Sequence, residues 1–371
     1  MITRRSFGRR AAALAGAGSA WTEATLAQRA LIGETFSPNT VWLNANENPD
    51  GPCRTAIEAM NRVVPETWRY HYPEFREFNA AVARSERLDP EQIIVGAGST
   101  EVLNVIVAAF TSATRPLITP VPTFEVPAEF ARALGHKWVR VPLTSTYAAD
   151  VKRLAQEAAS AGGGLIYLCN PNNPTSSMTP RADLAWLVSN LPPETVLLVD
   201  EAYLHFVENY EQESALPWVR EGKNIIVTRT FSKIYGMAGL RVGFGCGRPD
   251  LIGKVRPFRN NAITIVGARA VLAALSEAST LVPQRRARLI KVRSGLCEWL
   301  RKRNLRYIEP HANFIMIDVG MDSRGLGLAL LKKDVAVGRP FPPLDKMLRV
   351  SIGTEQDMAK FRQAFAEVYP A

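Results

Sequence analysis

The sequence predicts an α/β protein in which a mostly parallel, doubly wound sheet forms a large domain and a smaller α+β domain follows it. Three observations carry this prediction: short apolar runs recur between residues 92 and 247, helical patterns lie between most of them, and the pattern changes after about residue 262. Runs without polar alternation are typical of strands that helices cover on both faces. Their alternation with helices is typical of a parallel sheet.

The strands of the large domain are expected in six apolar runs, at residues 92–98, 116–122, 164–171, 195–203, 224–233 and 241–247. The periodicity between them predicts helices over residues 100–110, 126–134, 149–161 and 180–191. Beyond residue 262 we expect one long helical stretch over 263–304, with Arg and Lys along one face. A strand near 314–319, a helix near 325–333, a strand near 348–352 and a closing helix from residue 355 are then expected.

The chain has 371 residues, 47% of them hydrophobic, which is enough for a large core and for two domains. We expect a signal or disordered segment over residues 1–30 and an N-terminal arm over 31–60 that joins the small domain. The large, cofactor-binding domain is expected over 61–261 and the small C-terminal domain over 262–371.

The composition argues against several classes of protein. Lys and Arg exceed Asp and Glu by 45 − 35 = 10, which favours anionic ligands, but the basic residues are scattered, so nucleic-acid binding is not indicated. The four cysteines form no CxxC pair and the four histidines have no ligand spacing. Neither a disulfide framework nor a metal site is therefore expected.

The first thirty residues have the composition of an export signal. The basic stretch "MITRRSFGRR" precedes the small, weakly apolar stretch "AAALAGAGSA", and Thr3–Phe7 resembles a twin-arginine signal. A small-residue cleavage site is available around Ala27. We expect export to the periplasm, the alternative being a cytoplasmic protein with a basic tail. No other segment has the roughly 18 apolar residues of a membrane-spanning helix.

Polar residues follow three of the predicted strands. Asn173, Asp200 and Lys233 lie 27 and 33 residues apart, each step being about one βαβ unit. Because ligands bind in open α/β sheets at the carboxyl ends of the strands, we expect these side chains to share one pocket.

An amine, a carboxylate and hydrogen-bonding groups together meet the demands of pyridoxal phosphate. Lys233 can form a Schiff base with its aldehyde, and Asp200 can hold the proton on its ring nitrogen. Tyr203 and Asn173 can bond its phenolic oxygen. The phosphate can be held by side chains and by backbone N–H groups at a helix N-terminus, and the candidates are Ser99, Thr100, Thr230, Ser232 and Arg241.

Gly96 and Gly98 could instead begin a dinucleotide-binding fingerprint. The third glycine of that pattern is replaced by Glu101, so a lone GxG pair is weak evidence.

In these stretches the chain resembles the fold-type I aminotransferases, and within them the histidinol-phosphate aminotransferase-like branch. The stretches that carry the resemblance are "LNANENPDGP" (43–52), "NPNNPT" (170–175), "DEAY" (200–203), "TFSKIYGMAGLRVG" (230–243), "VGRPF" (337–341) and "LRVSIGT" (348–354). They occur in family order over nearly all of the chain after residue 40.

The resemblance implies further site residues. Phe124 would stack on the pyridine ring, and Tyr72 would reach the phosphate bound by a neighbouring subunit, which implies a homodimer. Arg349 would bind the substrate α-carboxylate, Arg339 a second anionic group, and Asn46 would lie near the substrate entrance. The chain departs from the family pattern at Ser176, where glycine is usual, and in its export signal, which is unusual in a branch concerned with histidine synthesis.

The resemblance implies a transaminase that moves an amino group between an amino acid, of histidinol-phosphate-like, aromatic or other type, and a 2-oxo acid. Lys233, Asp200 and Tyr203 would be its catalytic residues. Alternatives are a decarboxylase or an elimination or cyclisation enzyme with the same cofactor. A transcription regulator on this fold would need a DNA-binding domain ahead of it, and a cofactor-binding protein without turnover would not need the complete set of site residues.

Overall fold

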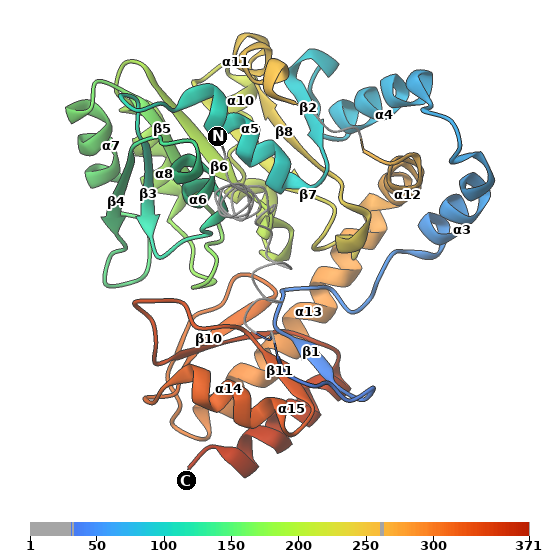
Figure 1. The fold of residues 1–371 in the computed structure, drawn as a ribbon, viewed down its shortest axis with the longest axis vertical. Coiled ribbons are helices and arrows are strands. Elements are labelled where there is room, and N and C mark those ends of the chain that lie inside the picture. The colour runs from blue at the N-terminus through green and yellow to red at the C-terminus, as the bar shows by residue number, and fades with distance from the viewer. Residues whose placement is uncertain (1–30, 32, 260–262, 371) are drawn as a thin grey trace, which may run out of the picture.

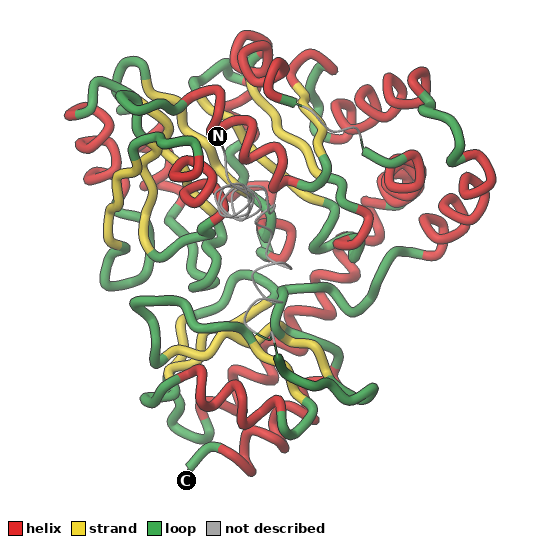
Figure 2. Tube along the Cα trace, viewed as in Figure 1, coloured by secondary structure: helices red, strands yellow, loops and turns green. Residues whose placement is uncertain are grey.

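The computed structural model describes residue 31 and residues 33–259 and 263–370, and the predicted export signal in residues 1–30 lies outside them. Figure 1 shows a larger body built on a sheet and a smaller one below it, with the long helix α13 (Ala278–Arg301) running from one to the other. Strands lie between helices in the larger body (Figure 2), which confirms the predicted fold class.

The large sheet has seven strands in the order β2-β8-β7-β6-β5-β3-β4. Their bounds are β2 (Ile93–Gly96), β3 (Leu117–Val121), β4 (Trp138–Pro142), β5 (Gly164–Cys169), β6 (Thr195–Asp200), β7 (Ile225–Thr230) and β8 (Gly243–Gly247). Neighbouring strands are parallel except where β8 pairs with β2 and with β7. The six expected strands are all present.

The edge strand β4 was not expected from the sequence. It carries the exposed Arg140 and is only partly buried, so it lacks the wholly apolar run that marks the covered strands. Its pairing with β3 alone explains this difference, because an edge strand is less completely covered than a central one.

Helices of the large body agree with the expected ones to within a few residues at their ends. They are α5 (Ser99–Phe110), α6 (Val126–Ala133), α7 (Val151–Ser160) and α8 (Arg181–Ser189). The shorter α9 (Tyr210–Glu213), α10 (Leu216–Arg220) and α11 (Pro249–Val255) follow. Two further helices, α3 (Arg54–Val63) and α4 (Tyr72–Ser85), project to one side beside α12 (Ile265–Ser276) in Figure 1.

The small body contains two sheets. In one, β10 (Phe314–Asp318) lies antiparallel between β12 (Met347–Ser351) and β9 (Tyr307–Ile308). In the other, β1 (Val41–Leu43) of the N-terminal arm pairs in parallel with β11 (Val335–Val337). The helices α14 (Ser323–Leu331) and α15 (Glu355–Val368) complete it. The arm therefore supplies a strand to the small body.

The stretch expected to be helical over 263–304 is helical over most of its length but is not one continuous helix. The structure has two helices, α12 and α13, bent by 85° at Glu277, whose backbone leaves the helical region. The bend allows α12 to pack in the large body while α13 continues to the small one. Within the described residues no single helix is long and apolar enough to cross a membrane, although this bent pair meets the length and composition criteria jointly.

The hydrophobic core divides into two main clusters. Leu43 of β1 belongs to the cluster of the small body, whereas Ala56 and Val63 of α3 belong to that of the large one. Ala268 and Val271 of α12 also pack in the large cluster. The large cluster therefore includes α3, which begins before the expected boundary at residue 60, and α12, which follows the expected boundary at residue 262. A helix packs where its apolar face can be buried, whatever its position in the chain.

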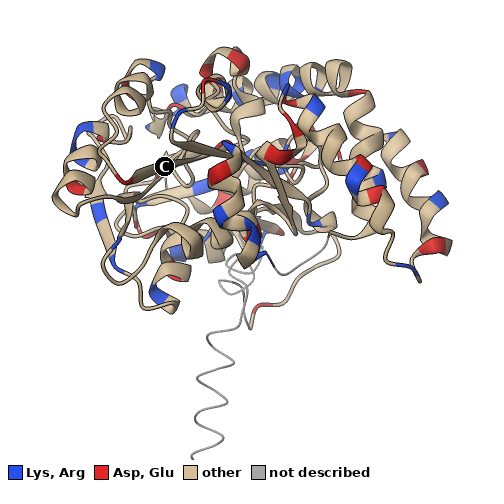
Figure 3. Cartoon of the chain, turned by 90° about the horizontal axis from the view of Figure 1, so that it is seen from above, with Lys and Arg blue, Asp and Glu red and all other residues tan. Residues whose placement is uncertain are grey.

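Charged residues of both signs are interspersed over the elements (Figure 3), in agreement with the scattered basic residues of the sequence. Residues 1–30 hold five arginines and one glutamate and so account for 5 − 1 = 4 of the ten formal positive charges, and the other six are spread over the rest of the chain.

Candidate active site

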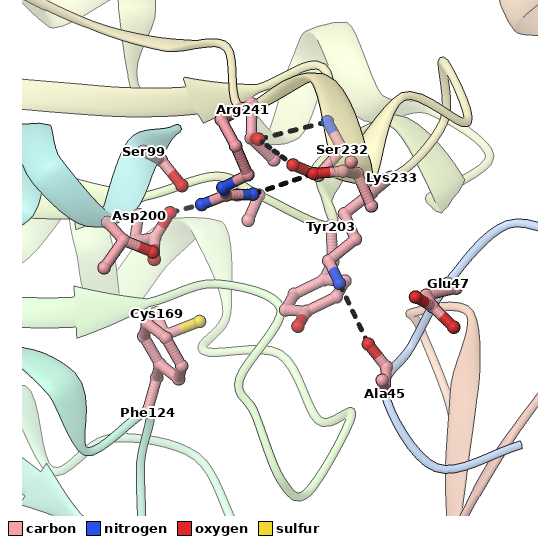
Figure 4. A pocket seen from close by; sticks show the side chains of 15 residues that line it. Ala45, Glu47, Ser99, Phe124, Cys169, Asp200, Tyr203, Ser232, Lys233 and Arg241 are labelled. Atoms are coloured by element: carbon pink, nitrogen blue, oxygen red, sulfur yellow. Dashed lines mark hydrogen bonds between the residues drawn. The ribbon is translucent and has the colours of Figure 1, made fainter. Parts of the chain in front are cut away.

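A cavity of about 240 Å³ lies where the strands β5, β6 and β7 end and the helix α5 begins. Nine of the predicted site residues line it: Ser99, Thr100, Phe124, Asp200, Tyr203, Thr230, Ser232, Lys233 and Arg241. The carboxyl ends of parallel strands meet at one edge of the sheet, which brings together residues more than a hundred positions apart. Figure 4 shows the same group from close by.

Lys233 is buried in the loop after β7, and its amine reaches the cavity. Nζ donates hydrogen bonds to the carbonyl oxygens of Ala45, at 3.2 Å, and Asn46, at 2.9 Å, and lies 5.5 Å from the centre of the Tyr203 ring (Figure 4). The N-terminal arm that follows β1 thus closes the site from the side of the small body. This amine can act as a nucleophile and as a base.

Asp200 ends β6 with its carboxyl group almost completely buried, at 2% exposure. Its Oδ1 accepts hydrogen bonds from the Thr228 hydroxyl at 3.1 Å and the Ala202 N–H at 3.2 Å, and its Oδ2 accepts one from the Tyr167 hydroxyl at 3.2 Å. Burial raises the pKa of Asp200 to about 6, although the hydrogen bonds oppose the shift. A bound cation would favour the ionised form.

Sequence reasoning missed the two side-chain partners of Asp200, Tyr167 and Thr228. Strand register contains the signal: Asp200 pairs with Thr228 on β7 and with Cys169 on β5. Tyr167 precedes Cys169 by two positions and so faces the same side of the sheet. The register between strands is a tertiary property, and motif spacing does not give it.

Tyr203, Asn173, Asn46 and Arg349 form one hydrogen-bonded chain beside the cavity. The Tyr203 hydroxyl accepts from the amides of Asn46 at 3.2 Å and Asn173 at 3.5 Å. The Arg349 guanidinium donates to the Asn173 side-chain oxygen at 2.8 Å and is fully buried. Although Asn46, Asn173 and Arg349 do not line the cavity themselves, this chain connects the small-body strand β12 to the phenol at its edge.

The phosphate-binding candidates form a cradle at the N-terminus of α5. A Cβ atom at Gly98 would clash with the Arg241 guanidinium, and one at Gly243 would clash with the backbone nitrogen of Ser99. Arg241 donates to the Ala238 carbonyl at 2.9 Å, and burial lowers its pKa. Backbone N–H groups, hydroxyls and a guanidinium converge here, which suits a phosphate group.

Substitution of Gly98 by alanine should weaken cofactor binding by about tenfold or more, because Gly98 has φ +82° and its new Cβ would displace Arg241. Titration of the cofactor-free protein with pyridoxal phosphate, followed by tryptophan fluorescence, measures this. Gly253→Ala, in the helix α11 with open space around it, is the matched control. Equal affinities of the two variants would contradict the role of the cradle.

Two predicted residues lie away from the cavity. Tyr72 is 74% exposed at the start of α4 and stacks on Tyr70 with ring centres 5.8 Å apart. Arg339 lies in the loop after β11, where its guanidinium pairs with Glu125. Neither residue lines the cavity of its own chain.

The cavity also has walls that sequence reasoning did not assign. Cys169, Ala202, Ala45, Glu47, Ala238 and Gly239 line it together with the predicted residues. Ala45 and Glu47 flank Asn46, and Ala238 and Gly239 lie between Lys233 and Arg241, so each belongs to a stretch already singled out. Among the described residues no cluster of His, Cys, Asp or Glu has the arrangement of a metal site.

The geometry fits pyridoxal phosphate at three points. A buried amine, a buried carboxyl group and an anion cradle surround the same cavity, matching the aldehyde, the ring nitrogen and the phosphate. Phe124 offers an aromatic wall for a ring.

The sequence of the chain is similar to those of known aminotransferases. The sequence model described as aminotransferase class I and II matches residues 38–365. A histidinol-phosphate aminotransferase of Symbiobacterium thermophilum is 33% identical over 87% of this chain and 89% of its own length. An aromatic amino acid aminotransferase of Cutibacterium acnes is 29% identical over 90% and 94%.

The crystal structure of histidinol-phosphate aminotransferase from Sinorhizobium meliloti in complex with pyridoxal 5'-phosphate is similar in fold. It matches with a TM-score of 0.81 and 25% identity, over 94% of each chain.

Proposed function

The chain belongs to the family of class I and II aminotransferases and is a pyridoxal-phosphate-dependent transaminase, and from this premise we propose the roles of its residues and its substrate class. The observation that carries the assignment of roles is that Lys233 and Asp200 line one cavity beside an anion cradle. When bound, the cofactor supplies an aldehyde and a ring that accepts the electron pair left at the substrate Cα.

Lys233 moves the proton in this proposal. Its Nζ would take the proton from the substrate Cα and later return one, because this amine stands at the wall of the cavity that the substrate enters. Asp200 holds the proton on the ring nitrogen, and its burial strengthens that ion pair. Tyr203, oriented by the amides of Asn46 and Asn173, bonds the phenolic oxygen.

The remaining residues bind and orient. Backbone N–H groups of Ser99 and Thr100 hold the phosphate together with the hydroxyls of Thr230 and Ser232 and the Arg241 guanidinium. Phe124 would offer its aromatic face to the cofactor ring. Arg349, whose guanidinium is buried beside the cavity, would bind the substrate α-carboxylate, and Arg339 would face the distal end of the substrate.

We propose an aromatic or histidinol-phosphate-like amino donor and a 2-oxo acid acceptor, on the basis of the activities of the similar enzymes. The test is to titrate the cofactor-loaded protein with a panel of amino donors while its visible absorption and the released product are followed. Keto-acid formation with loss of the visible band supports transamination. Release of carbon dioxide would contradict transamination and indicate a decarboxylase, and release of an eliminated group would indicate an elimination enzyme.

We propose that the protein is a homodimer in which Tyr72 reaches the site of the other subunit. The exposed aromatic residues Trp68, Tyr70 and Tyr72 favour this, since such a group on a surface marks an interface. We expect Tyr72→Phe to weaken cofactor binding. When subunits of this variant are exchanged with subunits of Lys233→Ala, each mixed dimer should have one site with both Lys233 and Tyr72, and that site should bind the cofactor with wild-type affinity. Such sites arise only if Tyr72 acts in the neighbouring subunit, and a mixture that gains none would contradict the proposal.

We further propose export by the twin-arginine route. Arg4 and Arg5 stand in the pattern of that signal, and a route for folded proteins suits an enzyme that binds its cofactor before export. Replacement of both by lysine should leave the protein in the cytoplasm, as cell fractionation would measure. Unchanged export of that variant, or cytoplasmic wild-type protein, would exclude the route.

A further inference from the structure

Arg339 is held by a carboxylate of its own chain. Its Nη2 lies 2.5 Å from Glu125 Oε2, and its Nη1 donates to Oε1 of the same group at 3.3 Å. The arginine side chain is 13% exposed and the glutamate 39% exposed. Glu125 precedes α6 of the large body, and Arg339 follows β11 of the small one, so the ion pair joins the two bodies.

This ion pair lies beside the candidate active site. Glu125 follows Phe124, a wall of the cavity. On the other side, the Arg339 guanidinium lies 4.1 Å from the centre of the Phe341 ring, and Arg349 lies 4.5 Å from the same ring. Both guanidinium groups therefore lie against the same aromatic side chain, and Arg339 also pairs with Glu125, which follows the cavity-lining Phe124.

The geometry of the pair matters for substrate choice. A guanidinium presents a planar fork that binds a carboxylate or phosphate with two hydrogen bonds, and Glu125 occupies this fork with both of its oxygens. A substrate with a distal anionic group must displace Glu125 and leave two negative groups near one another. An uncharged side chain has no such requirement, and the Phe341 ring offers it an apolar surface.

We propose that Glu125 is a specificity-determining residue: as an internal counter-ion of Arg339 it disfavours substrates with a second anionic group and favours amino acids with an uncharged, aromatic side chain. This inference rests on the proposed function and narrows its substrate class. Specificity of this kind comes from a repulsive element that acts against the competing ligand.

The test compares the binding of two substrate-like acids to the cofactor-loaded protein by calorimetry, which does not need turnover. Glutarate carries two carboxylates, and 3-phenylpropanoate carries one carboxylate and an uncharged ring. For Glu125→Gln we expect the Kd of glutarate to fall about five- to tenfold, and that of 3-phenylpropanoate to change less than about twofold. The double variant Glu125→Gln, Arg339→Gln should lose this gain in glutarate affinity.

Glu129→Gln is the matched control, because Glu129 lies on α6, the helix that Glu125 precedes, and pairs at 2.8 Å with Arg132, outside the site. Thermal melting and the absorption of the bound cofactor verify that each variant is folded and loaded. A glutarate Kd unchanged in Glu125→Gln, or an equal change for both acids, would overturn the proposal. If the expected shift occurs but no donor yields a keto acid, the specificity inference stands and the proposed reaction fails.

Discussion

Replacement of Lys233 by alanine is expected to lower kcat/KM for transamination at least about a thousandfold. Within the part of the chain that the structure describes, Lys233 is the only lysine that lines the cavity, so no other lysine amine of its own chain stands there to move the Cα proton. The variant should still bind the cofactor weakly, because Arg241 and Asp200 remain. Steady-state assays of keto-acid formation and an equilibrium titration with pyridoxal phosphate measure the two effects.

The control for this variant is Lys223→Ala, which removes an exposed lysine just before β7. It should behave as the wild type in both measurements. A Lys233→Ala protein with activity near that of the control would refute the role assigned to the lysine.

Replacement of Asp200 by asparagine is expected to lower kcat about 10²- to 10⁴-fold. The amide cannot hold the ring nitrogen in its protonated form by charge. The fold should be preserved, because the amide oxygen still accepts from Thr228 and Ala202, and the Tyr167 oxygen can accept from the new amide. The exposed Asp345→Asn is the control, and Asp200→Asn with the kcat of this control would exclude the ion pair.

The same variant tests the environment of Asp200 through its pH dependence. The pKa of Asp200 is about 6 in the fold without cofactor, against an ordinary value of 3.8, so the folded state binds the proton more tightly than the unfolded state. The stability that this group contributes is therefore complete below pH 4 and decreases as the pH rises through 6. In the cofactor-free protein, the free energy of unfolding of Asp200→Asn should exceed that of the wild type at pH 7 by up to about 3 kcal/mol.

Denaturant unfolding at pH 4 and pH 7 would measure this difference in the free energy of unfolding. The advantage of the variant should vanish at the lower pH, because both proteins are then uncharged at this position. A constant difference across the two pH values would show that the carboxyl group is not desolvated.

Much of the candidate site could be predicted from the sequence because strand ends and motifs are local features. Asp200 and Lys233 stand at the ends of apolar runs, and the parallel strands bring them to one edge of the sheet. Arg241 stands at the start of its run and reaches the same edge because β8 is antiparallel to β7. Arg349 was predicted only through the family resemblance. It is connected to the site by its hydrogen bond to Asn173 of the large body, and such a contact between two bodies leaves no pattern in the sequence. The edge strand β4 was missed because partial exposure removes the uniform apolar pattern.

The sequence by itself determined the fold class, the cofactor and the residues at the strand ends, because these depend on periodicity and on the chemistry of neighbouring residues. The tertiary structure alone decided that Tyr167 and Thr228 hold Asp200, that Glu125 holds Arg339, and that the chain bends at Glu277. Each of these depends on strand register or on the packing of two bodies. Such contacts join residues whose separation in the chain carries no periodic signal, and burial and charge pairing select them only once the fold has formed.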